Sequence, residues 1–210
     1  MSAAAKFRTP KFITLEGVDG AGKSTHLQFI ADAAAAASGR RAIVTREPGG
    51  TDLAERLRQA ILEEPLEPLA ETVLIFAARA HHVAKVIRPA LEAGSWVVCD
   101  RFLDATYAYQ GAGKGVPVEL IETLSAASHP GLAPDRTLVF DCSYELARRR
   151  LAGSGKKLDR FEREDRAFFE RVRNAYLARA KTEPGRIRVI DAAADLATIR
   201  KSLERALLFP

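Results

Sequence analysis

An eight-residue segment of the sequence has the spacing of a phosphate-binding loop. Residues 17–24 read GVDGAGKS and fit the pattern G-x-x-x-x-G-K-[ST] at every position. Glycines let successive backbone N–H groups point at phosphate oxygens, and a helix beginning there adds its dipole. We expect Lys23 to reach the β- and γ-phosphates of ATP and the Ser24 hydroxyl to bind Mg²⁺. The residues expected to bind the nucleotide are Gly17, Val18, Asp19, Gly20, Ala21, Gly22, Lys23, Ser24 and Thr25.

A glycine-rich turn without a ligand is the alternative for this segment. The complete motif lies between a strand-like run and a helix-forming run, and that context favours phosphate binding. The motif alone does not distinguish a kinase from an ATPase or a GTPase. No Asn-Lys-x-Asp motif for reading guanine occurs in the sequence, which disfavours a GTPase.

The rest of the chain alternates short apolar runs with longer segments that favour helices. The apolar runs are rich in Val, Ile and Phe, as strands buried on both faces are. The expected strands are 11–16, 42–45, 96–99, 137–141 and 187–191. The expected helices are 23–38, 52–63, 68–92, 118–127, 144–152, 162–181 and 196–207. This alternation predicts an α/β fold, with a five-stranded parallel sheet flanked by helices on both faces.

A single domain is expected, because 210 residues without a Ser/Gly/Pro-rich linker are typical of one compact unit. Residues 11–210 are expected to form it, after a disordered tail at 1–10. No apolar run approaches the length of about 18 residues that a membrane span needs. The first ten residues carry no apolar signal-peptide core, and the two cysteines suggest no disulfide framework, so we expect a cytoplasmic protein.

The charge of the chain is concentrated in one segment. The net charge is +5, from 32 basic and 27 acidic residues. Between Arg148 and Arg166 there are eight Lys/Arg and four Asp/Glu, so this segment carries +4 of the total. A nucleic-acid binder more often spreads its basic residues over a face or along a helix. The pattern therefore favours a small, highly charged ligand such as a nucleotide phosphate, and no nucleic-acid partner is expected.

Four segments besides the loop carry a family resemblance. They are REPGGT at 46–51, FAAR at 76–79, DRF at 100–102 with YQG at 109–111, and the basic segment around 156–163. In this order they resemble the thymidylate kinases, from about Phe12 to about Leu207. The resemblance implies a P-loop kinase fold with a mobile lid at about 148–163. It also implies transfer of a phosphoryl group from Mg-ATP to dTMP, which gives dTDP.

The resemblance implies roles for residues on the acceptor side. In the family, the position of Asp19 contacts the 3′-hydroxyl of dTMP, and those of Arg46 and Arg101 bind its phosphate. Asp100, which ends an apolar run, is expected to hold Mg²⁺ through water. Further residues expected to bind dTMP are Phe76, stacked on thymine, Arg79, at its O4, and Thr106, Tyr109 and Gln110, near base and sugar.

Each of these residues could instead have a purely structural role. Arg46 could form a salt bridge in its own loop, and Asp100 could cap a helix. Phe76 could belong to the core, because it also lies on an apolar helix seam, and Arg79 could be a solvated helix residue. Thr106 and Tyr109 could be ordinary loop residues.

The lid is where the sequence departs from the family pattern. One type of thymidylate kinase has a basic residue in the phosphate loop where this chain has Gly20. The chain therefore resembles the type whose lid supplies the cations that meet the transferred phosphoryl. The lid tip carries Lys156 and Lys157 where the family often has arginine, and lysine offers a point charge instead of a fork. The residues expected to be catalytic are Lys23, Arg101, Asp19, Arg149 and Arg160, with Lys157 behind them.

The long helix expected at 68–92 has apolar residues at alternating spacings of four and three. They are Leu69, Val73, Phe76, Ala80, Val83 and Ile87. The seam alone does not distinguish packing on the sheet from packing on a second copy of the chain. In the family that the chain resembles, this helix forms a homodimer interface, so the resemblance implies a homodimer.

Two rival functions remain open. One is a kinase of the same fold for a deoxynucleoside or another nucleotide, and the other is a nucleotide-binding module without turnover.

Overall fold

The computed structural model describes residues 11–208, so the tail expected at 1–10 lies outside the described residues. The strands are β1 (Phe12–Glu16), β2 (Ile43–Arg46), β3 (Val97–Asp100), β4 (Arg136–Asp141) and β5 (Ile187–Asp191). They form one parallel sheet in the order β2-β3-β1-β4-β5. The prediction of a five-stranded parallel sheet is confirmed.

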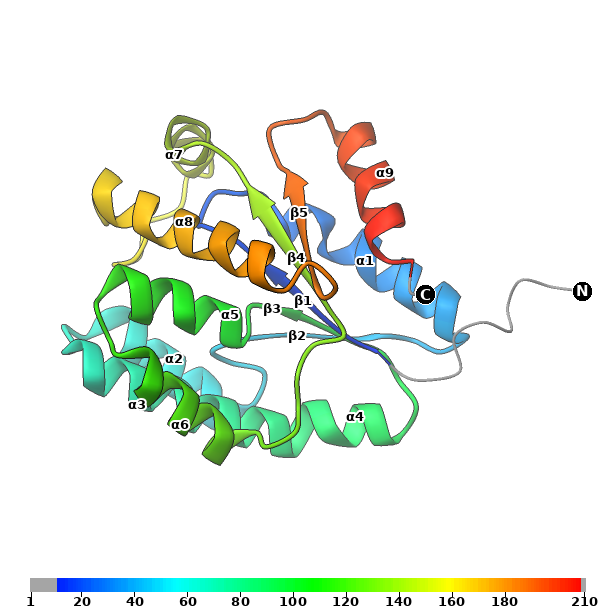
Figure 1. Ribbon diagram of the computed structural model, residues 1–210, viewed down its shortest axis with the longest axis horizontal. Helices are drawn as coiled ribbons and strands as arrows, with labels where there is room; N and C mark the ends of the chain where they lie inside the picture. The colour runs from blue at the N-terminus through cyan, green and yellow to red at the C-terminus, as the bar shows by residue number, and fades with distance from the viewer. Residues whose placement is uncertain (1–10, 209–210) are drawn as a thin grey trace, which may run out of the picture.

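Helices lie against both faces of this sheet (Figure 1). They are α1 (Lys23–Ser38), α2 (Asp52–Glu63), α3 (Pro68–His82), α4 (Arg88–Glu92), α5 (Leu103–Thr106), α6 (Val118–Ser128), α7 (Tyr144–Gly153), α8 (Arg166–Thr182) and α9 (Leu196–Ala206). Two π-helical segments complete the set, η2 (Val83–Ile87) and η3 (Tyr107–Gly113). Within residues 11–208, none of these helices combines the length and the apolar character needed to cross a membrane.

Strand β1 shows how the two faces are built, because alternate side chains of a strand point to opposite faces. Ile13 and Leu15 are buried with Ile30 of α1 on one face. Phe12 is buried with Val83 and Ile87 of η2 on the other face. The central strand is therefore apolar on both sides, as its uninterrupted apolar sequence indicated.

The helix expected at 68–92 is interrupted. It divides into α3, the π-helical η2 and α4. Pro89 lies in the first turn of α4 and has no N–H to donate, so the hydrogen-bond register of the preceding turn changes there. A second departure is the helical segment 103–113, formed by α5 and η3, which the apolar pattern did not predict.

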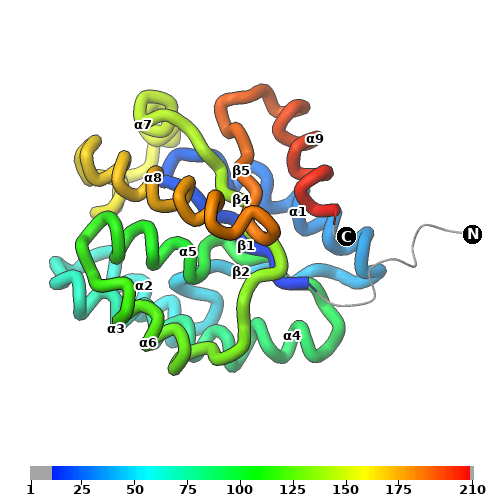
Figure 2. The backbone as a smooth tube through the Cα atoms, in the orientation of Figure 1, coloured from blue at the N-terminus to red at the C-terminus, as the bar shows by residue number. Residues whose placement is uncertain are grey.

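The strand order places the phosphate loop next to the ends of two other strands. The loop follows β1, which lies between β3 and β4. In open parallel sheets, ligands bind beyond the carboxyl ends of strands where the chain changes direction across the sheet. The segment from α7 to α8 lies at the same end of the molecule (Figure 2). The sheet therefore brings the loop, Asp100-Arg101 and the lid segment to one edge.

Gly17 lets the loop leave β1 in close contact with β4. Its φ is +127°, and a Cβ added there would lie 2.4 Å from the carbonyl oxygen of Phe140. Gly39 also has a positive φ, of +68°, at the end of α1, but a Cβ there would meet nothing within 4 Å. An alanine at Gly39 would therefore introduce backbone strain alone, whereas an alanine at Gly17 would add a collision with β4.

Gly17→Ala is expected to destabilise the protein more than Gly39→Ala and to abolish ATP binding. Gly39→Ala adds only the left-handed strain of about 1 kcal/mol, which lowers Tm by about 2–4 °C in a chain of this size. Gly17→Ala adds a backbone collision to that strain. Thermal melting and calorimetric titration with ATP measure the two effects. Equal melting temperatures for the two variants would contradict this reading of the loop.

Candidate active site

The phosphate loop and the start of α1 form one wall of a large hollow. Lys23 is buried, and its Nζ donates to the carbonyl oxygens of Gly17 and Val18, each at 3.1 Å. Burial lowers the pKa of Lys23, and the nearby Arg101 lowers it further. The hollow is lined by the whole segment from Asp19 to Thr25. Of the residues predicted to bind the nucleotide, Asp19 to Thr25 therefore line one cavity, whereas Gly17 and Val18 do not line it.

The opposite wall of this donor hollow comes from the lid and from the chain after β5. Arg150 and Lys156 line it, together with Ala192 and Ala194. Arg150 donates to the carbonyl oxygens of Ala21 (3.0 Å) and Ala192 (2.8 Å), so it ties α7 to both walls. Two lid cations therefore face the phosphate loop.

Asp100 provides the carboxylate expected near Mg²⁺. Its Oδ1 is buried and has no hydrogen-bond partner, although nearly all buried polar atoms in proteins have one. Among the described residues, no group of three or more His, Cys, Asp or Glu gathers to hold a metal. The unpartnered oxygen of Asp100 fits Mg²⁺, which keeps several waters and binds through one or two protein groups together with substrate phosphates. Asp100 and Ser24 are the residues that fit the ion.

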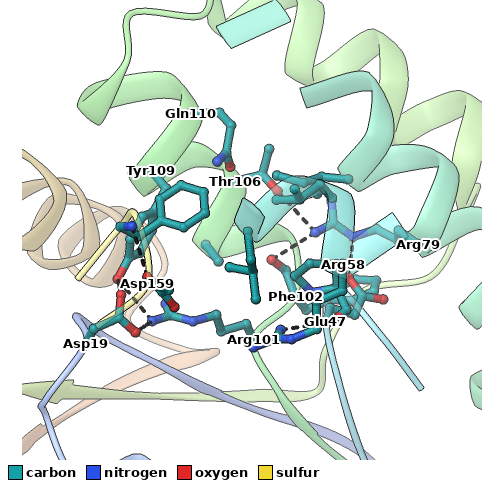
Figure 3. A pocket seen from close by; sticks show the side chains of 16 residues that line it. Asp19, Glu47, Arg58, Arg79, Arg101, Phe102, Thr106, Tyr109, Gln110 and Asp159 are labelled. Atoms are coloured by element: carbon teal, nitrogen blue, oxygen red, sulfur yellow. Dashed lines mark hydrogen bonds and ion pairs between the residues drawn. The ribbon is translucent and has the colours of Figure 1, made fainter. Parts of the chain in front are cut away.

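Arg101 lies at the centre of the site. Its backbone has a φ of +69°, which is uncommon for a residue with a side chain. Its Nη2 donates to Asp19 Oδ1 at 2.5 Å and to the Tyr109 hydroxyl at 3.0 Å, while Nη1 donates to the Gly17 carbonyl at 2.9 Å. Tyr109 in turn donates to Asp19 Oδ2 at 2.8 Å. The arrangement is seen at one side of the pocket in Figure 3.

Electrostatics keep this group of residues charged. Burial favours the neutral form of Asp19, but Arg101 and Lys23 outweigh it and lower the pKa of the carboxyl. Burial opposes the charge of Arg101 too, yet Asp19 raises the pKa of the guanidinium well above its ordinary value. The ion pair therefore persists over the physiological pH range.

A second cavity, of about 90 Å³, lies beside Arg101. Its apolar lining includes Ile61, Ile75 and Phe102. Arg79 forms the polar end, and Figure 3 shows it across the pocket from Asp19. Asp19 also lines the donor hollow, so the two cavities meet at this residue.

Arg79 is fixed by a buried network. Its Nε donates to Glu47 at 2.6 Å, and its Nη2 donates to the Phe102 carbonyl and the Thr106 hydroxyl, each at 3.1 Å. The remaining Nη1 is buried without a partner. Arg79 therefore offers one free donor at the pocket, and the alternative of a solvated helix residue is wrong.

Thr106, Tyr109 and Gln110 all line this acceptor pocket, as expected. Each is buried, and they come from α5 and η3. The alternative of ordinary loop residues does not hold, because the segment is helical.

Phe76 does not lie in the acceptor pocket. It packs with Val116 and Ile121 and stacks on His129 at a centroid distance of 6.4 Å. Ile75 faces the pocket together with Arg79, four residues later, because positions four apart share a helix face more closely than positions three apart. The expected stacking role of Phe76 is therefore corrected, and Phe102 is an aromatic residue that lines the pocket.

Arg46 also lies outside the acceptor pocket. It is paired with Glu55 at 2.9 Å, and its side chain is 55% exposed. A salt bridge was the alternative considered for Arg46, but its partner lies on α2 and not in the same loop. Arg58 of α2 lines the pocket instead. Burial lowers the pKa of Arg58, and the nearby Arg46 and Arg101 lower it further. The sequence signal for Arg58 was its place on an amphipathic helix directly after the REPGGT segment.

The two lid arginines expected to be catalytic lie elsewhere. Arg149 is exposed on α7 and is not among the residues that line the donor hollow. Arg160 donates to the carboxylate of Glu71 and to the carbonyl of Ile61, which holds it at the outside of the acceptor pocket. Arg150, one residue further along α7, faces the loop because a helix turns by about 100° per residue.

Comparison with known proteins gives the family. A family model described as thymidylate kinase matches residues 15–203. The chain belongs to the thymidylate kinase family. The thymidylate kinase of Bordetella petrii is 54% identical over 197 residues, covering 94% of each chain, and that of Ralstonia nicotianae is 53% identical over 95% of this chain and 98% of its own. A crystal structure of thymidylate kinase from Ehrlichia chaffeensis is 32% identical, with a TM-score of 0.77 over 95% of this chain and 99% of that one.

The family assignment confirms the resemblance found in the sequence, including the P-loop kinase fold.

Glu16, which the sequence analysis did not select, is hydrogen-bonded to residues that border the acceptor pocket. Its Oε1 accepts from the Phe102 N–H at 2.7 Å, and its Oε2 accepts from the Tyr176 hydroxyl at 2.8 Å. Tyr176 also accepts a hydrogen bond from Arg101, at 3.2 Å. Burial, with a contribution from Asp104, raises the pKa of Glu16 to about 8.

The raised pKa predicts how stability depends on pH. The folded protein keeps the Glu16 proton up to about pH 8, whereas the unfolded chain releases it near its ordinary pKa of 4.5. The free energy of unfolding should therefore fall as pH rises from about 4.5 to 8. Urea unfolding of the wild type and of Glu16→Gln across this pH range measures the effect. The variant has no carboxyl at this position, so its free energy of unfolding should lack this pH dependence. Parallel pH profiles for the two proteins would contradict the raised pKa.

Proposed function

We propose that the chain transfers the γ-phosphoryl group of ATP to dTMP, giving ADP and dTDP, with donor and acceptor meeting at Asp19. The single observation that carries this proposal is the shared wall of the two cavities. One is lined by a complete phosphate loop, and the other is lined by Arg58, Arg79 and Arg101. A phosphate bound near Arg101 lies directly beside the donor phosphates.

The residues of the acceptor pocket support dTMP as the substrate. The free Nη1 of Arg79 can donate to O4 of thymine, which favours thymine over cytosine because cytosine presents an amino donor there. Ile75 and Phe102 supply apolar surface for the base. A carboxylate accepts about four hydrogen bonds, so Asp19 can accept from the sugar 3′-hydroxyl besides its present partners.

Phosphate binding on the acceptor side falls to Arg58 and Arg101. Both line the pocket, and guanidinium groups match phosphate oxygens. The Nη atoms of Arg101 donate to protein partners, so Arg101 would bind the phosphate through Nε or by exchanging one of these partners. The acceptor phosphate is already ionised, so no general base is needed. A bond forms between its oxygen and the γ-phosphorus, the bond from the γ-phosphorus to the β–γ bridging oxygen breaks, and ADP leaves with that oxygen.

Fixed positive charge is the main contribution of the protein to this step, because little covalent chemistry is required of it. Lys23 and the loop N–H groups hold the donor phosphates. Mg²⁺, bound by Asp100 and Ser24, would neutralise phosphate charge. We assign the lid contribution to Arg150 and Lys156, which face the donor hollow. This placement of Lys156 also weighs against a binding module without turnover.

The activity is tested by ADP release from Mg-ATP with dTMP, dUMP, dCMP, AMP and thymidine as acceptors. We expect dTMP to be preferred and dUMP to come second, because both present an acceptor at O4. Arg101→Ala should raise KM for dTMP strongly. ATP binding without stimulation by any acceptor would support the module without turnover, and a preference for thymidine or another nucleotide would support the rival kinase.

The arginine assignment gives a second prediction. Arg58→Ala should raise KM for dTMP by about tenfold, as expected for a hydrogen bond to a charged group. Arg46→Ala should change it by less than about threefold, because an exposed ion pair to Glu55 is worth little. Steady-state kinetics at saturating ATP compare the two variants. The opposite order would restore the phosphate role first expected of Arg46.

We also propose that the chain is a cytoplasmic homodimer formed through α3. The expected seam is divided, because Phe76, Val83 and Ile87 pack inside the protein. Leu69 and Val73, four residues apart, are 57% and 46% exposed and form an apolar strip on the outer side of α3. A second copy of the chain would cover this strip. The free thiols of Cys99 and Cys142 are consistent with a cytoplasmic location.

Val73→Glu is expected to convert the dimer into a monomer, because it places a charge in an apolar interface. Light scattering coupled to size-exclusion chromatography measures the mass of both proteins. Lys85→Glu, at an exposed position on η2 outside the strip, is a control that should keep the dimer. A monomeric wild-type protein would contradict the proposal.

A further inference from the structure

A buried carboxylate outside the two cavities ties the lid to the body of the protein. Glu71 lies in the first turn of α3 and is fully buried. Its Oε1 accepts from Gln110 Nε2 at 2.7 Å. Its Oε2 accepts from Lys114 Nζ at 2.7 Å and from Arg160 Nη2. A buried carboxylate is costly unless it is paired and hydrogen-bonded, so these donors are required partners of Glu71.

Only one of the three donors belongs to the lid. Gln110 and Lys114 come from η3 and the residue after it, whereas Arg160 comes from the segment between α7 and α8. The Nε of Arg160 also donates to the carbonyl of Ile61 in α2. Arg160 therefore reaches from the lid to α2 and α3, and both of these helices line the acceptor pocket.

The residues on either side of Arg160 lie in the acceptor pocket itself. Asp159 and Phe161 both line it. The Phe161 ring meets Tyr109 edge-on at a centroid distance of 5.8 Å, and Lys114 Nζ lies 4.7 Å from the same ring. Because Arg160 is between them in the chain, its anchoring to Glu71 decides where these two side chains stand.

We propose that Glu71 is a positioning residue that holds the end of the lid over the acceptor pocket through Arg160. Glu71 lines neither cavity, so it acts on dTMP through Arg160 and, on the other side, through Gln110. Closing the pocket aligns dTMP with the donor phosphate and excludes water, which competes as a phosphoryl acceptor. This inference rests on the proposed function.

The test is a double-mutant cycle on Glu71 and Arg160. Glu71→Gln and Arg160→Gln should each lower kcat/KM for dTMP by about tenfold, in line with a charge-assisted hydrogen bond. The double variant should be no worse than either single variant, because both remove the same interaction. Arg186→Gln is the matched control, since Arg186 also donates to a buried carboxylate, that of Asp104, but lines neither cavity and does not belong to the lid. Its kcat/KM should stay within about twofold of the wild type.

A second readout separates positioning from stability alone. The ratio of ADP released to dTDP formed should rise several-fold in Glu71→Gln and Arg160→Gln, because a loosened lid admits water. Arg160→Lys should restore part of the coupling. Loss of Tm with an unchanged ratio, additive losses in the double variant, or an equal kinetic effect of Arg186→Gln would each overturn the proposal.

Failure of the proposed function and failure of the role of Glu71 give different results. If Glu71→Gln does not fold, the comparison of Arg160→Gln, Arg160→Lys and Arg186→Gln decides alone, because the Arg160 side chain is 22% exposed and tolerates change better. If the wild-type protein makes no dTDP, the proposed function fails. If it makes dTDP and the variants behave alike, only the role of Glu71 fails.

Discussion

The ion pair between Arg101 and Asp19 is the interaction on which the site depends. It joins the end of β3 to the loop after β1, and through Tyr109 and Tyr176 it reaches η3 and α8. Four separate elements therefore converge on one guanidinium. The uncommon backbone conformation of Arg101 is held by these partners, since strain of this kind persists only where the surroundings fix it. Without this pair, the donor and acceptor cavities would have no common wall.

Buried charge is balanced in the same way elsewhere around the site. Glu47 is paired with Arg79 and His82, and Asp104 is paired with Arg179 and Arg186. Both partners of Glu47 come from α3, whereas Asp104 is paired with Arg179 of α8 and with Arg186 before β5. Each carboxylate connects parts of the chain that are distant in sequence. Glu16 is the exception. It receives only neutral donors, and burial therefore raises its pKa.

The sequence predicted the features that depend on local pattern. Motif and hydrophobic pattern predicted the phosphate loop, the five parallel strands and the place of Asp100 and Arg101 at the end of β3. What it missed depends on contacts across the fold. The stacking role given to Phe76 followed the family resemblance, whereas the helical spacing of four residues places Ile75 on the face of Arg79. The packing between helices decides which arginines reach the pockets. A sequence pattern does not show this for Arg46, Arg58, Arg149 and Arg160.

The position of Asp19 at the junction of both cavities has a consequence for inhibitor design. A molecule that joins a thymidine-like group to an adenine-like group would pass Asp19, which lines both cavities. Once one end is bound, the other end faces its cavity at an effective concentration set by the linker. The gain is greatest when the linker has the length of the bridging phosphates. Lys23, Arg150 and Lys156 line one cavity and Arg101 lines the other, so a negatively charged linker matches this junction better than a neutral one.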